Sequence, residues 1–430
     1  MNRLKEKTKN DKAWERLFED YGILEKISNN EFFEIDSSQI NKIRESRLMA
    51  KFDHYVNLPL IFRENQISIL PISRSRYVLG NFDTHFAVKY DSNKDVIPID
   101  FPEDIESIDH TNLYSESSAL NCAFNSGIID ELIDEKVYHT LSGRMSTDIF
   151  SFKIRNFVTG TSLINVQNSQ CEIDAGFESE NYLIIVEAKN YTVDDFLIRQ
   201  LYYPYRLWSG KITKKVIPVL MTYSNDVFSF FIYDFKKDSD YNSLTLVEQK
   251  NYAINSEGID LSDVSKLFEK VEIIIEPNDV PFPQADKLER VVDLMSLLVE
   301  KDLTKDEITE NYQFDVRQTN YYTDAGRYIG LVNKYKNPIT KEITFSLTEE
   351  AKCLLRKRHK IKYLNLFKKI LEHRVFYKVF ELSVMEGEIP AQPEVCQIMS
   401  ESDLGINETT IARRSRTVRK WIEWLWSQID

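Results

Sequence analysis

Two apolar segments joined by a short polar turn constrain the fold of this chain more than any other feature. Residues 170–178 and 182–189 have the composition of β-strands, so the sequence predicts a β-hairpin. If Glu180-Asn181 forms the loop, Asp174 lies directly opposite Glu187, with Cβ atoms about 5 Å apart. A four-residue loop keeps that pairing, whereas a three-residue loop breaks it.

The second strand ends in charged residues that share one face. Side chains alternate along a strand, so Ile185, Glu187 and Lys189 point the same way, and Asp174 is expected to meet them. Buried charges are costly unless they are paired or bound to a metal. Two carboxylates with a nearby backbone carbonyl provide the oxygen shell that Mg²⁺ prefers, and an adjacent lysine can orient or help deprotonate a water. This combination suits attack on a phosphodiester.

The spacing resembles the D…(D/E)xK signature of the PD-(D/E)xK nucleases: Asp174, a gap of twelve residues, then Glu187-Ala188-Lys189. The resemblance implies Mg²⁺-dependent hydrolysis of DNA. Asp174, Glu187 and the backbone of Ala188 would then be metal ligands, and Lys189 would activate the attacking water. The proline of the family name is absent, because Ile173 precedes Asp174. This departure is common in the family.

Two further residues are candidates for the same site. Many family members carry an upstream helical acid, and Glu116 lies on the core-facing stripe of a predicted helix, which makes it a further catalytic and metal-binding candidate. Gln200 lies on the predicted helix after Lys189, where some members place a glutamine facing the site. The structural alternatives are a partly exposed helix carboxylate for Glu116 and an ordinary helix side chain for Gln200. For Glu187 and Lys189 the alternative is a solvated ion pair, with Asp174 capping a turn.

Hydrophobic periodicity predicts a multidomain α+β or α/β chain with a mixed sheet flanked by helices. Helices are expected in 1–50, 111–134, 193–208, 285–300 and much of the chain beyond, and strands in 55–100, 147–154, 170–178, 182–189, 215–223 and 227–235. We expect four parts: an N-terminal α/β recognition or clamp module over 1–100, a PD-(D/E)xK core over 101–276, a winged-helix module over 284–360, and a second helix-turn-helix or winged-helix-like module over 361–430.

The C-terminal part carries two helices with residue types that contact DNA. Residues 317–331 read as a polar-faced helix, preceded by a helix at 304–311 that Thr304 would cap and followed by a hairpin. This order resembles a winged helix, whose second helix enters the major groove. A later helix, with Thr409 as the expected cap, is rich in arginine. The DNA-contact candidates on the two helices are Arg317, Gln318, Asn320, Tyr321, Arg327, Arg413, Arg414 and Arg416.

The N-terminal block offers Arg74 and Arg76 as further DNA contacts, because its segments resemble those that precede the core in some multidomain type II restriction endonucleases. For each basic segment the alternative is a solvated surface. The net charge of −13 hides an asymmetry, since residues 351–430 carry a charge of +5 and the first 350 residues carry −18. A basic C-terminal part is compatible with DNA binding and equally with an ordinary acidic enzyme.

Missing motifs narrow the class of enzyme. The sequence has no GxxxxGK[ST] loop, which disfavours an ATP-driven nuclease. The six histidines show no ligand spacing and the four cysteines form no CxxC, so a zinc site is not indicated and a reducing cytoplasm fits. No apolar run approaches 18 residues, and the charged start has no signal-peptide pattern, so we expect no membrane association.

The sequence therefore predicts a cytoplasmic, site-specific, Mg²⁺-dependent double-stranded DNA endonuclease of the type II restriction kind. The resemblance also implies a cognate DNA methyltransferase as a functional partner. Two alternatives stay open: a repair or recombination nuclease on the same core, and a non-enzymatic winged-helix DNA-binding protein. Two-fold symmetric recognition sites would favour a homodimer, whereas several recognition modules in one chain would suit an asymmetric site.

Overall fold

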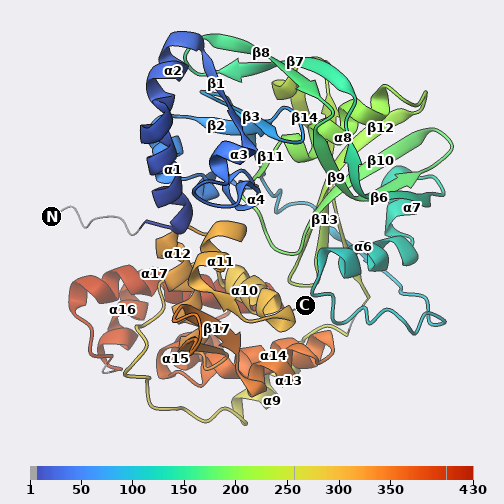
Figure 1. Cartoon of the computed structure of the whole chain (residues 1–430). Coiled ribbons are helices and arrows are strands. Elements are labelled where there is room, and N and C mark those ends of the chain that lie inside the picture. Colours follow the sequence, from blue (N-terminus) through green and yellow to red (C-terminus); the bar gives the residue numbers. More distant parts are fainter. Residues whose placement is uncertain (1–6, 256, 403, 430) are drawn as a thin grey trace.

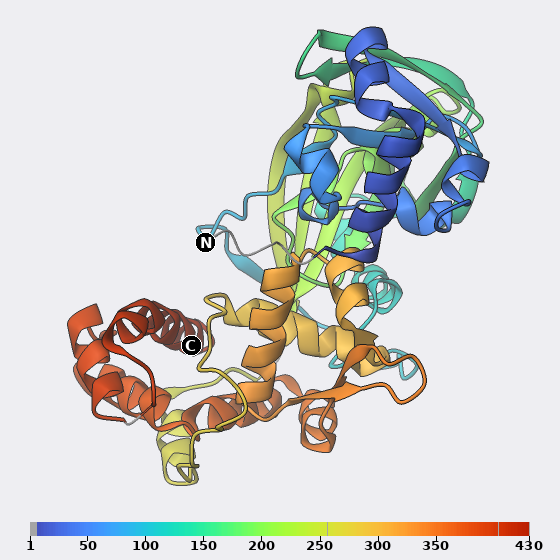
Figure 2. The same ribbon diagram turned by 60° about the vertical axis from the view of Figure 1, so that its left-hand side comes forward.

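The computed structural model describes residues 7–255, 257–402 and 404–429 and shows two lobes. The N-terminal and central parts form the upper lobe in Figure 1, and the mainly helical part from Leu261 onward forms the lower lobe. A turn of 60° shows the lobes meeting along one side of the upper lobe (Figure 2). Within the described ranges, no helix combines the length and the apolar character needed to cross a membrane.

A small α/β unit forms the start of the chain. Its three-stranded antiparallel sheet has the order β1-β3-β2, and Trp14, Leu17 and Phe62 fill a core of its own. The expectation of helix throughout 1–50 was wrong where β1 pairs with β3, because Phe32 and Phe33 begin an extended, half-buried segment. The elements are α1 (Lys9–Tyr21), α2 (Ile23–Asn30), β1 (Phe32–Asp36), α3 (Ser37–Ile40), α4 (Ser46–Met49), η1 (Tyr55–Asn57), α5 (Leu60–Glu64), β2 (Ser68–Pro71) and β3 (Arg76–Gly80).

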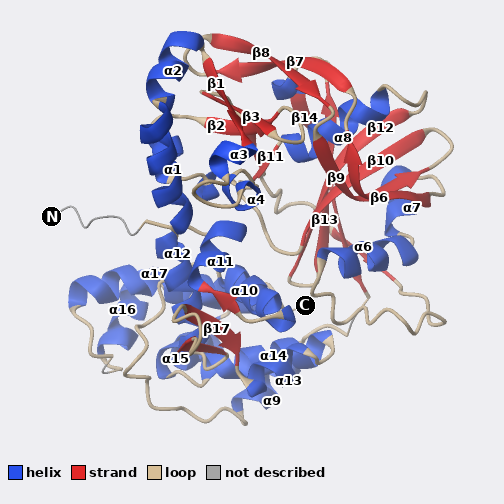
Figure 3. Cartoon of the chain, viewed as in Figure 1, coloured by secondary structure: helices blue, strands red, loops and turns tan. Residues whose placement is uncertain are grey.

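A seven-stranded sheet forms the centre of the upper lobe, in the order β5-β14-β13-β12-β10-β9-β6. β10 runs parallel to β12 and β14 runs parallel to β5, whereas the other neighbours are antiparallel. The expected large mixed sheet with helices around it is therefore confirmed (Figure 3). The strands are β5 (Val96–Ile99), β6 (Tyr138–Ser146), β9 (Gln170–Glu178), β10 (Tyr182–Lys189), β12 (Lys215–Ser224), β13 (Val227–Phe235) and β14 (Leu244–Ile254).

Alternation along β10 sends its side chains into two separate apolar cores. Leu183 and Ile185 pack in the core that contains α8, whereas Ile184 and Val186 pack in the core that contains α6 and α7. Glu187 and Lys189 follow the parity of Ile185, which places them on the α8 side. The other elements of this lobe are α6 (Glu116–Asn125), α7 (Ile128–Ile133), α8 (Arg199–Ser209), β4 (His85–Ala87), β7 (Ile149–Asn156), β8 (Gly160–Gln167), β11 (Asp195–Leu197) and η2 (Tyr241–Ser243).

The β9–β10 hairpin has the predicted register. Val186 pairs with Ala175, and the Ser179 N–H donates to the Tyr182 carbonyl at 2.9 Å, which leaves Glu180-Asn181 as the loop. This result confirms the predicted register as far as Ala175, whereas the predicted pair of Asp174 with Glu187 is not formed, because the ladder ends one residue before it.

Two predicted helices have other boundaries. The helix expected over 111–134 starts at Glu116 and is split at Gly127, whose φ of 82° lies in the left-handed region that ends a helix. The helix expected over 193–208 starts at Arg199, because residues 195–197 pair with β4 as strand β11. The second error comes from a contact with a distant strand, which local periodicity does not report, whereas Gly127 is a local signal within the expected helix.

The lower lobe combines helices with a three-stranded sheet of order β15-β17-β16. Thr304 caps α11 as expected, since its hydroxyl accepts from the Glu307 N–H at 3.1 Å. The expected cap Thr409 was wrong: Asn407 caps α17 by accepting from the Thr410 N–H at 2.9 Å. The elements are α9 (Leu261–Phe268), α10 (Leu288–Glu300), β15 (Leu303–Thr304), α11 (Lys305–Asn311), α12 (Val316–Tyr328), β16 (Val332–Lys336), β17 (Ile343–Leu347), α13 (Glu349–Leu355), α14 (His359–Leu371), α15 (Arg374–Glu386), α16 (Gln392–Ser400) and α17 (Glu408–Trp426).

Candidate active site

An irregularity in β9 places Asp174 at the end of the hairpin. The backbone pairing of β9 with β10 stops at Ala175, and the Ala188 N–H then donates to the Asp174 carboxylate at 2.8 Å. The pairing of β9 with β6 shifts at the same point, where two residues of β9, Asp174 and Ala175, oppose the single residue Ser142 of β6. A bulge of this kind re-aims a side chain. Here it turns the Asp174 carboxylate toward the end of β10.

Lys189 and Glu187 form a buried ion pair at that point. The Lys189 ammonium lies 2.6 Å from Glu187 Oε1, and the two residues are only 5% and 7% exposed. Gln200, on the second position of α8, donates its side-chain amide to the same Glu187 oxygen. The structure thus brings together Asp174, Glu187, Lys189 and Gln200, which the sequence had placed on three separate elements.

Glu116 lies at the first position of α6, on the opposite side of the sheet from Gln200. Its half-buried carboxylate is close enough to feel the other charges. Burial raises the pKa of Glu116, Lys189 opposes that shift and Glu187 adds to it. Burial also raises the pKa of Asp174, again opposed by Lys189 and reinforced by Glu116.

The acids outnumber the cations at this site. Burial, opposed by Lys189 and reinforced by Asp174, raises the pKa of Glu187 to about 7. Burial alone would lower the pKa of Lys189, but Glu187 and Glu116 outweigh it and raise the pKa well above its ordinary value. Lys189 is therefore held as an ammonium ion. Its charge is not enough to let every neighbouring carboxyl ionise at its ordinary pKa.

Asp53, from the N-terminal unit, is a site residue that the sequence analysis missed. Its Oδ2 lies 3.8 Å from the Lys189 ammonium, and its buried Oδ1 has no hydrogen-bond partner among the described residues. Burial would raise the pKa of Asp53, but Lys189 and Lys51 outweigh it and lower the pKa to about 2. We refer to Asp53, Glu116, Asp174, Glu187 and Lys189 as the carboxylate cluster.

His54 holds the Asp53 segment against the loop that follows β10. Its Nε2 lies 2.9 Å from the Tyr191 hydroxyl, and its Nδ1 lies 2.7 Å from the Asp195 carbonyl. The ring is fully buried, so these contacts fix the backbone on both sides of the site. No local motif marks Asp53 or His54. The one available signal was a charged residue in an apolar neighbourhood before a buried histidine, far upstream of the hairpin.

Two carboxylates of the cluster keep oxygen atoms free for a ligand. Among the described residues, no hydrogen bond involves Asp174 Oδ1 or Glu187 Oε2, so each carboxylate keeps one oxygen for a ligand. The buried Oε1 of Gln200, like Oδ1 of Asp53, has no partner in the part of the chain that is described. Within residues 7–255, 257–402 and 404–429, no group of three or more acid, histidine or cysteine side chains is placed to hold a metal ion. Oxygen ligands are present, but the complete shell needs water or substrate.

The lower lobe covers this site. The Asn57 side chain donates to the Thr309 and Tyr312 carbonyls at 2.9 and 2.7 Å, and the Tyr312 ring centroid lies 5.6 Å from that of Tyr191. The Thr192 N–H donates to Asp293 at 3.0 Å. The loop after Lys189 therefore contacts α10 and the α11–α12 connection, and the two lobes are closed over the site.

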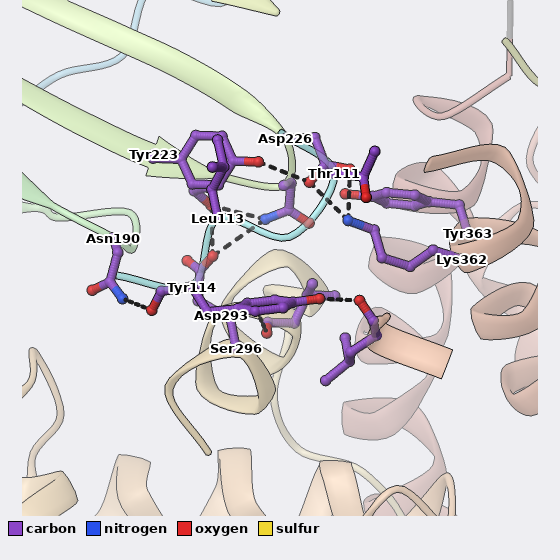
Figure 4. Close-up of a pocket in the computed structure, with 14 residues that line it drawn as sticks. Thr111, Leu113, Tyr114, Asn190, Tyr223, Asp226, Asp293, Ser296, Lys362 and Tyr363 are labelled. Carbon is purple, nitrogen blue, oxygen red and sulfur yellow. Dashed lines mark hydrogen bonds and ion pairs between the residues drawn. The ribbon is translucent and has the colours of Figure 1, made fainter. Parts of the chain in front are cut away.

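A second ion cluster, in which Lys362 is buried and Asp226 and His359 are half-buried, joins the lobes at the β12–β13 turn. Asp226 accepts from Lys362 at 2.8 Å and lies 2.7 Å from His359 Nδ1; these three residues form the docking cluster. Burial would raise the pKa of Asp226, but Lys362 and His359 hold it below its ordinary value. The docking cluster borders a small polar cavity between the lobes, into which Tyr363 and Asn190 also project (Figure 4).

The predicted DNA-contact residues of α12 divide into two groups. Arg317 is exposed, with Asn320 and Tyr321 half-buried on the same stripe. Gln318 instead completes the cap of α12, because its Oε1 accepts from the Asp315 N–H at 2.9 Å. Arg327 is paired with Asp324 at 2.8 Å and its side chain is 15% exposed, so it is tied to its own lobe.

The remaining predicted contacts lie on α17, on the loop before β3 and at the first residue of β3. Arg413 is exposed on α17, Arg414 is buried, and Arg416 pairs with Asp286 at 3.2 Å. Arg74 is exposed, and Arg76 is exposed but pairs with Glu34 at 3.2 Å. None of these residues lies in the carboxylate cluster, so any contact they make with DNA is separate from the chemistry.

Three domain families match consecutive parts of the chain. Residues 11–79 match the family described as "Domain of unknown function (DUF6996)", residues 80–253 match "Domain of unknown function (DUF6997)", and residues 290–430 match "Domain of unknown function (DUF7226)". Asp53 falls in the first match, and Glu116, Asp174, Glu187 and Lys189 fall in the second. No curated protein and no solved structure matched the chain.

Proposed function

We propose that this protein is a site-specific, Mg²⁺-dependent double-stranded DNA endonuclease of the type II restriction kind, built on a PD-(D/E)xK-like core. One observation carries the proposal: Asp174, Glu187 and Lys189 meet in a buried site at the end of the β9–β10 hairpin, where negative charge is in excess. The charges of a purely structural ion pair would balance. An excess of negative charge is instead expected at a site that binds a cation together with a phosphate.

Asp174 and Glu187 would hold the cation through their free oxygens, with the Ala188 backbone and Glu116 completing its surroundings. A bound Mg²⁺ would neutralise charge on the phosphodiester and make water a better nucleophile. Lys189, held as an ammonium by Glu187, would stabilise negative charge that develops on the phosphate. Its raised pKa argues against the predicted role as a base. Gln200 fixes the Glu187 carboxylate, and Asp53 fixes Lys189.

The element order of the lower lobe supports a winged-helix reading of 288–347. Helix α10, strand β15, helices α11 and α12, and strands β16 and β17 follow one another, and β17 lies between β15 and β16. The second helix of such a unit enters the major groove. Arg317, Asn320 and Tyr321 occupy the accessible stripe of α12, and α16–α17 would provide a second helix-turn-helix surface that carries Arg413.

A duplex needs the lobes to separate before it reaches the site. Glu187 and Lys189 are only 7% and 5% exposed because the lower lobe covers them. A scissile phosphate therefore cannot approach them in this arrangement. Apolar side chains of both lobes belong to one continuous core, so opening must separate apolar surfaces as well as the hydrogen bonds and ion pairs described above. Binding of DNA to the lower lobe would then be coupled to opening.

Digestion of supercoiled plasmid tests the proposal. We expect discrete linear fragments in Mg²⁺ and intact plasmid in EDTA. Smears or nicks without discrete ends would favour a repair or recombination nuclease on the same core. A protein that binds the plasmid but leaves it intact with Mg²⁺, Mn²⁺ and Co²⁺ would contradict enzymatic function. Sequencing the fragment ends would give the recognition sequence. Sedimentation with and without duplex would distinguish a homodimer from a monomer.

A further inference from the structure

A basic turn between α13 and α14 carries none of the residues assigned to DNA so far, although it lies within the predicted winged-helix module over 284–360. Arg356, Lys357 and Arg358 are all exposed, and none of them forms an ion pair within the described part of the chain. The cations that follow are different. His359 and Lys362 bind Asp226, and Lys360 lies 2.8 Å from Asp263. The basic residues of 356–362 therefore form two groups: His359, Lys360 and Lys362 pair with acids of other elements, whereas Arg356, Lys357 and Arg358 face solvent.

Hydrogen bonds attach this basic turn to both segments that bear catalytic candidates. The carbonyl of Leu355, immediately before the turn, accepts from the Tyr114 hydroxyl. The Tyr114 carbonyl in turn accepts from the Asn190 side chain at 2.9 Å, and Asn190 directly follows Lys189 (Figure 4). Tyr114 itself stands two residues before Glu116. These bonds hold the turn next to the segments that carry Glu116 and Lys189.

The start of α14 adds to the positive potential of the turn. α14 spans thirteen residues, and Arg358 at its N-cap position makes no side-chain capping bond. The free N–H groups of a first helical turn attract anions, and the three adjacent cations act in the same direction. Three exposed like charges next to one another repel unless an anion lies between them. Among common anions, a phosphate has oxygens that an arginine can bind through two hydrogen bonds at once.

We propose that Arg356, Lys357 and Arg358 hold backbone phosphates of the DNA substrate next to the phosphate that is cleaved. This inference rests on the proposed nuclease function and adds a substrate-positioning surface to it. The contact would be independent of sequence, because phosphate contacts set position and register without reading bases. It would also help to explain opening, since DNA held by the lower lobe at this turn lies next to the upper-lobe segments that carry Lys189 and Glu116.

The salt dependence of binding tests this inference. Anisotropy of a labelled random-sequence duplex, measured in EDTA so that no cleavage occurs, would be compared for the wild type and Arg356→Ala/Arg358→Ala. We expect the variant to bind about tenfold more weakly at low salt, and the slope of log Kd against log salt to fall by about two. Arg356→Lys/Arg358→Lys should restore most of the slope, because it keeps both charges.

A charge-matched control is Lys236→Ala/Lys237→Ala. Both residues are exposed directly after β13, at the end of that strand opposite to Asp226. This control should keep the wild-type slope. If the arginine variant also keeps it while the wild type cleaves plasmid, the inference is wrong and the nuclease stands. If the arginine variant alone loses binding but no protein cleaves, the turn binds DNA, but the nuclease is wrong and the substrate-positioning role falls with it. A wild type that ignores duplex DNA overturns both.

Discussion

The carboxylate cluster and the docking cluster hold acids beside a buried lysine at two neighbouring strands of one sheet, yet their charges balance differently. At the end of β12, the single carboxylate of Asp226 meets two partners, Lys362 and His359, and its pKa is lowered. At the end of β10, burial raises the pKa of Glu187 to about 7 despite Lys189, and buried polar atoms of Asp53 and Gln200 have no partner among the described residues.

The difference separates a structural ion cluster from a functional one. A satisfied buried pair fixes geometry, because removing either partner leaves an uncompensated charge. An unbalanced cluster lowers the stability of the isolated fold and gains from a ligand that supplies the missing charge. The docking cluster thus joins the lobes, and the carboxylate cluster is prepared for a cation. Each prediction below changes one side of this comparison.

Asp174→Asn should have the largest effect. The amide removes a carboxylate charge from the cation site, so cleavage should fall by at least about 10³-fold with every divalent ion, equivalent to about 4 kcal/mol of transition-state stabilisation. Single-turnover cleavage of a labelled duplex measures it. Glu172→Gln is the matched control, since Glu172 lies two residues away on β9 but is exposed and pairs with Arg144 at 3.4 Å. Equal loss in the two variants would contradict the assignment.

Lys362→Met should affect stability and spare the chemistry. Removing the cation leaves the half-buried Asp226 with His359 alone, which should lower the free energy of unfolding by about 3 kcal/mol. Urea denaturation measures the change. Lys352→Met, which removes an exposed pair with Glu349, should cost less than about 0.5 kcal/mol. Normal stability of Lys362→Met would show that the docking cluster does not join the lobes.

Two carboxylates at the lobe interface, Asp293 and Asp226, should change the free energy of unfolding in opposite directions as the pH rises. Burial, opposed by hydrogen bonds from Thr192 and Ser224, raises the pKa of Asp293 to about 7. The folded state then holds this proton more tightly than the unfolded state. The contribution of Asp293 to the free energy of unfolding is complete below the ordinary Asp pKa and is lost as the pH rises toward 7. The Asp226 contribution, from a lowered pKa, is instead lost as pH falls below the ordinary Asp pKa.

Urea midpoints between pH 3 and pH 8 would separate these contributions. Asp293→Asn should reduce the decline between about pH 4 and pH 7, to which Glu187 also contributes, whereas Asp226→Asn should reduce the acid-side loss, to which Asp53 also contributes. Unchanged profiles in both variants would contradict the electrostatic difference between the two carboxylates.

Asn57→Ala should raise cleavage modestly. Its side chain makes two hydrogen bonds to lower-lobe carbonyls, and losing about 1 kcal/mol of closure favours the open arrangement by roughly fivefold. Cleavage rates at limiting enzyme and subsaturating DNA measure the effect. Asn65→Ala is the control, because the Asn65 side chain donates only to the Ile61 carbonyl within its own segment. A lower rate for Asn57→Ala would indicate that the closed arrangement is itself the active one.

The hairpin was predictable from sequence, and its surroundings were not. Alternation and turn composition are local properties, so they fixed the β9–β10 register and the face that Glu187 and Lys189 share. The bulge at Asp174 depends on β6, which local patterns do not report. Asp53 reaches Lys189 only because His54 docks on Tyr191, a contact between distant segments. Gln318 shows the opposite error: its residue type suits base reading, but its side chain closes a helix cap.

The most direct test of the central claim compares Lys189→Ala with Lys362→Met in one assay. Duplex binding in Ca²⁺ and single-turnover cleavage in Mg²⁺ would be measured on the same labelled substrate, at a temperature where both variants are folded. Lys189→Ala should bind like the wild type and cleave at least about 10³-fold more slowly, whereas Lys362→Met should bind and cleave. Metal-dependent cleavage by Lys189→Ala at the wild-type rate would contradict the account, because the unbalanced cluster would then have no role in the chemistry.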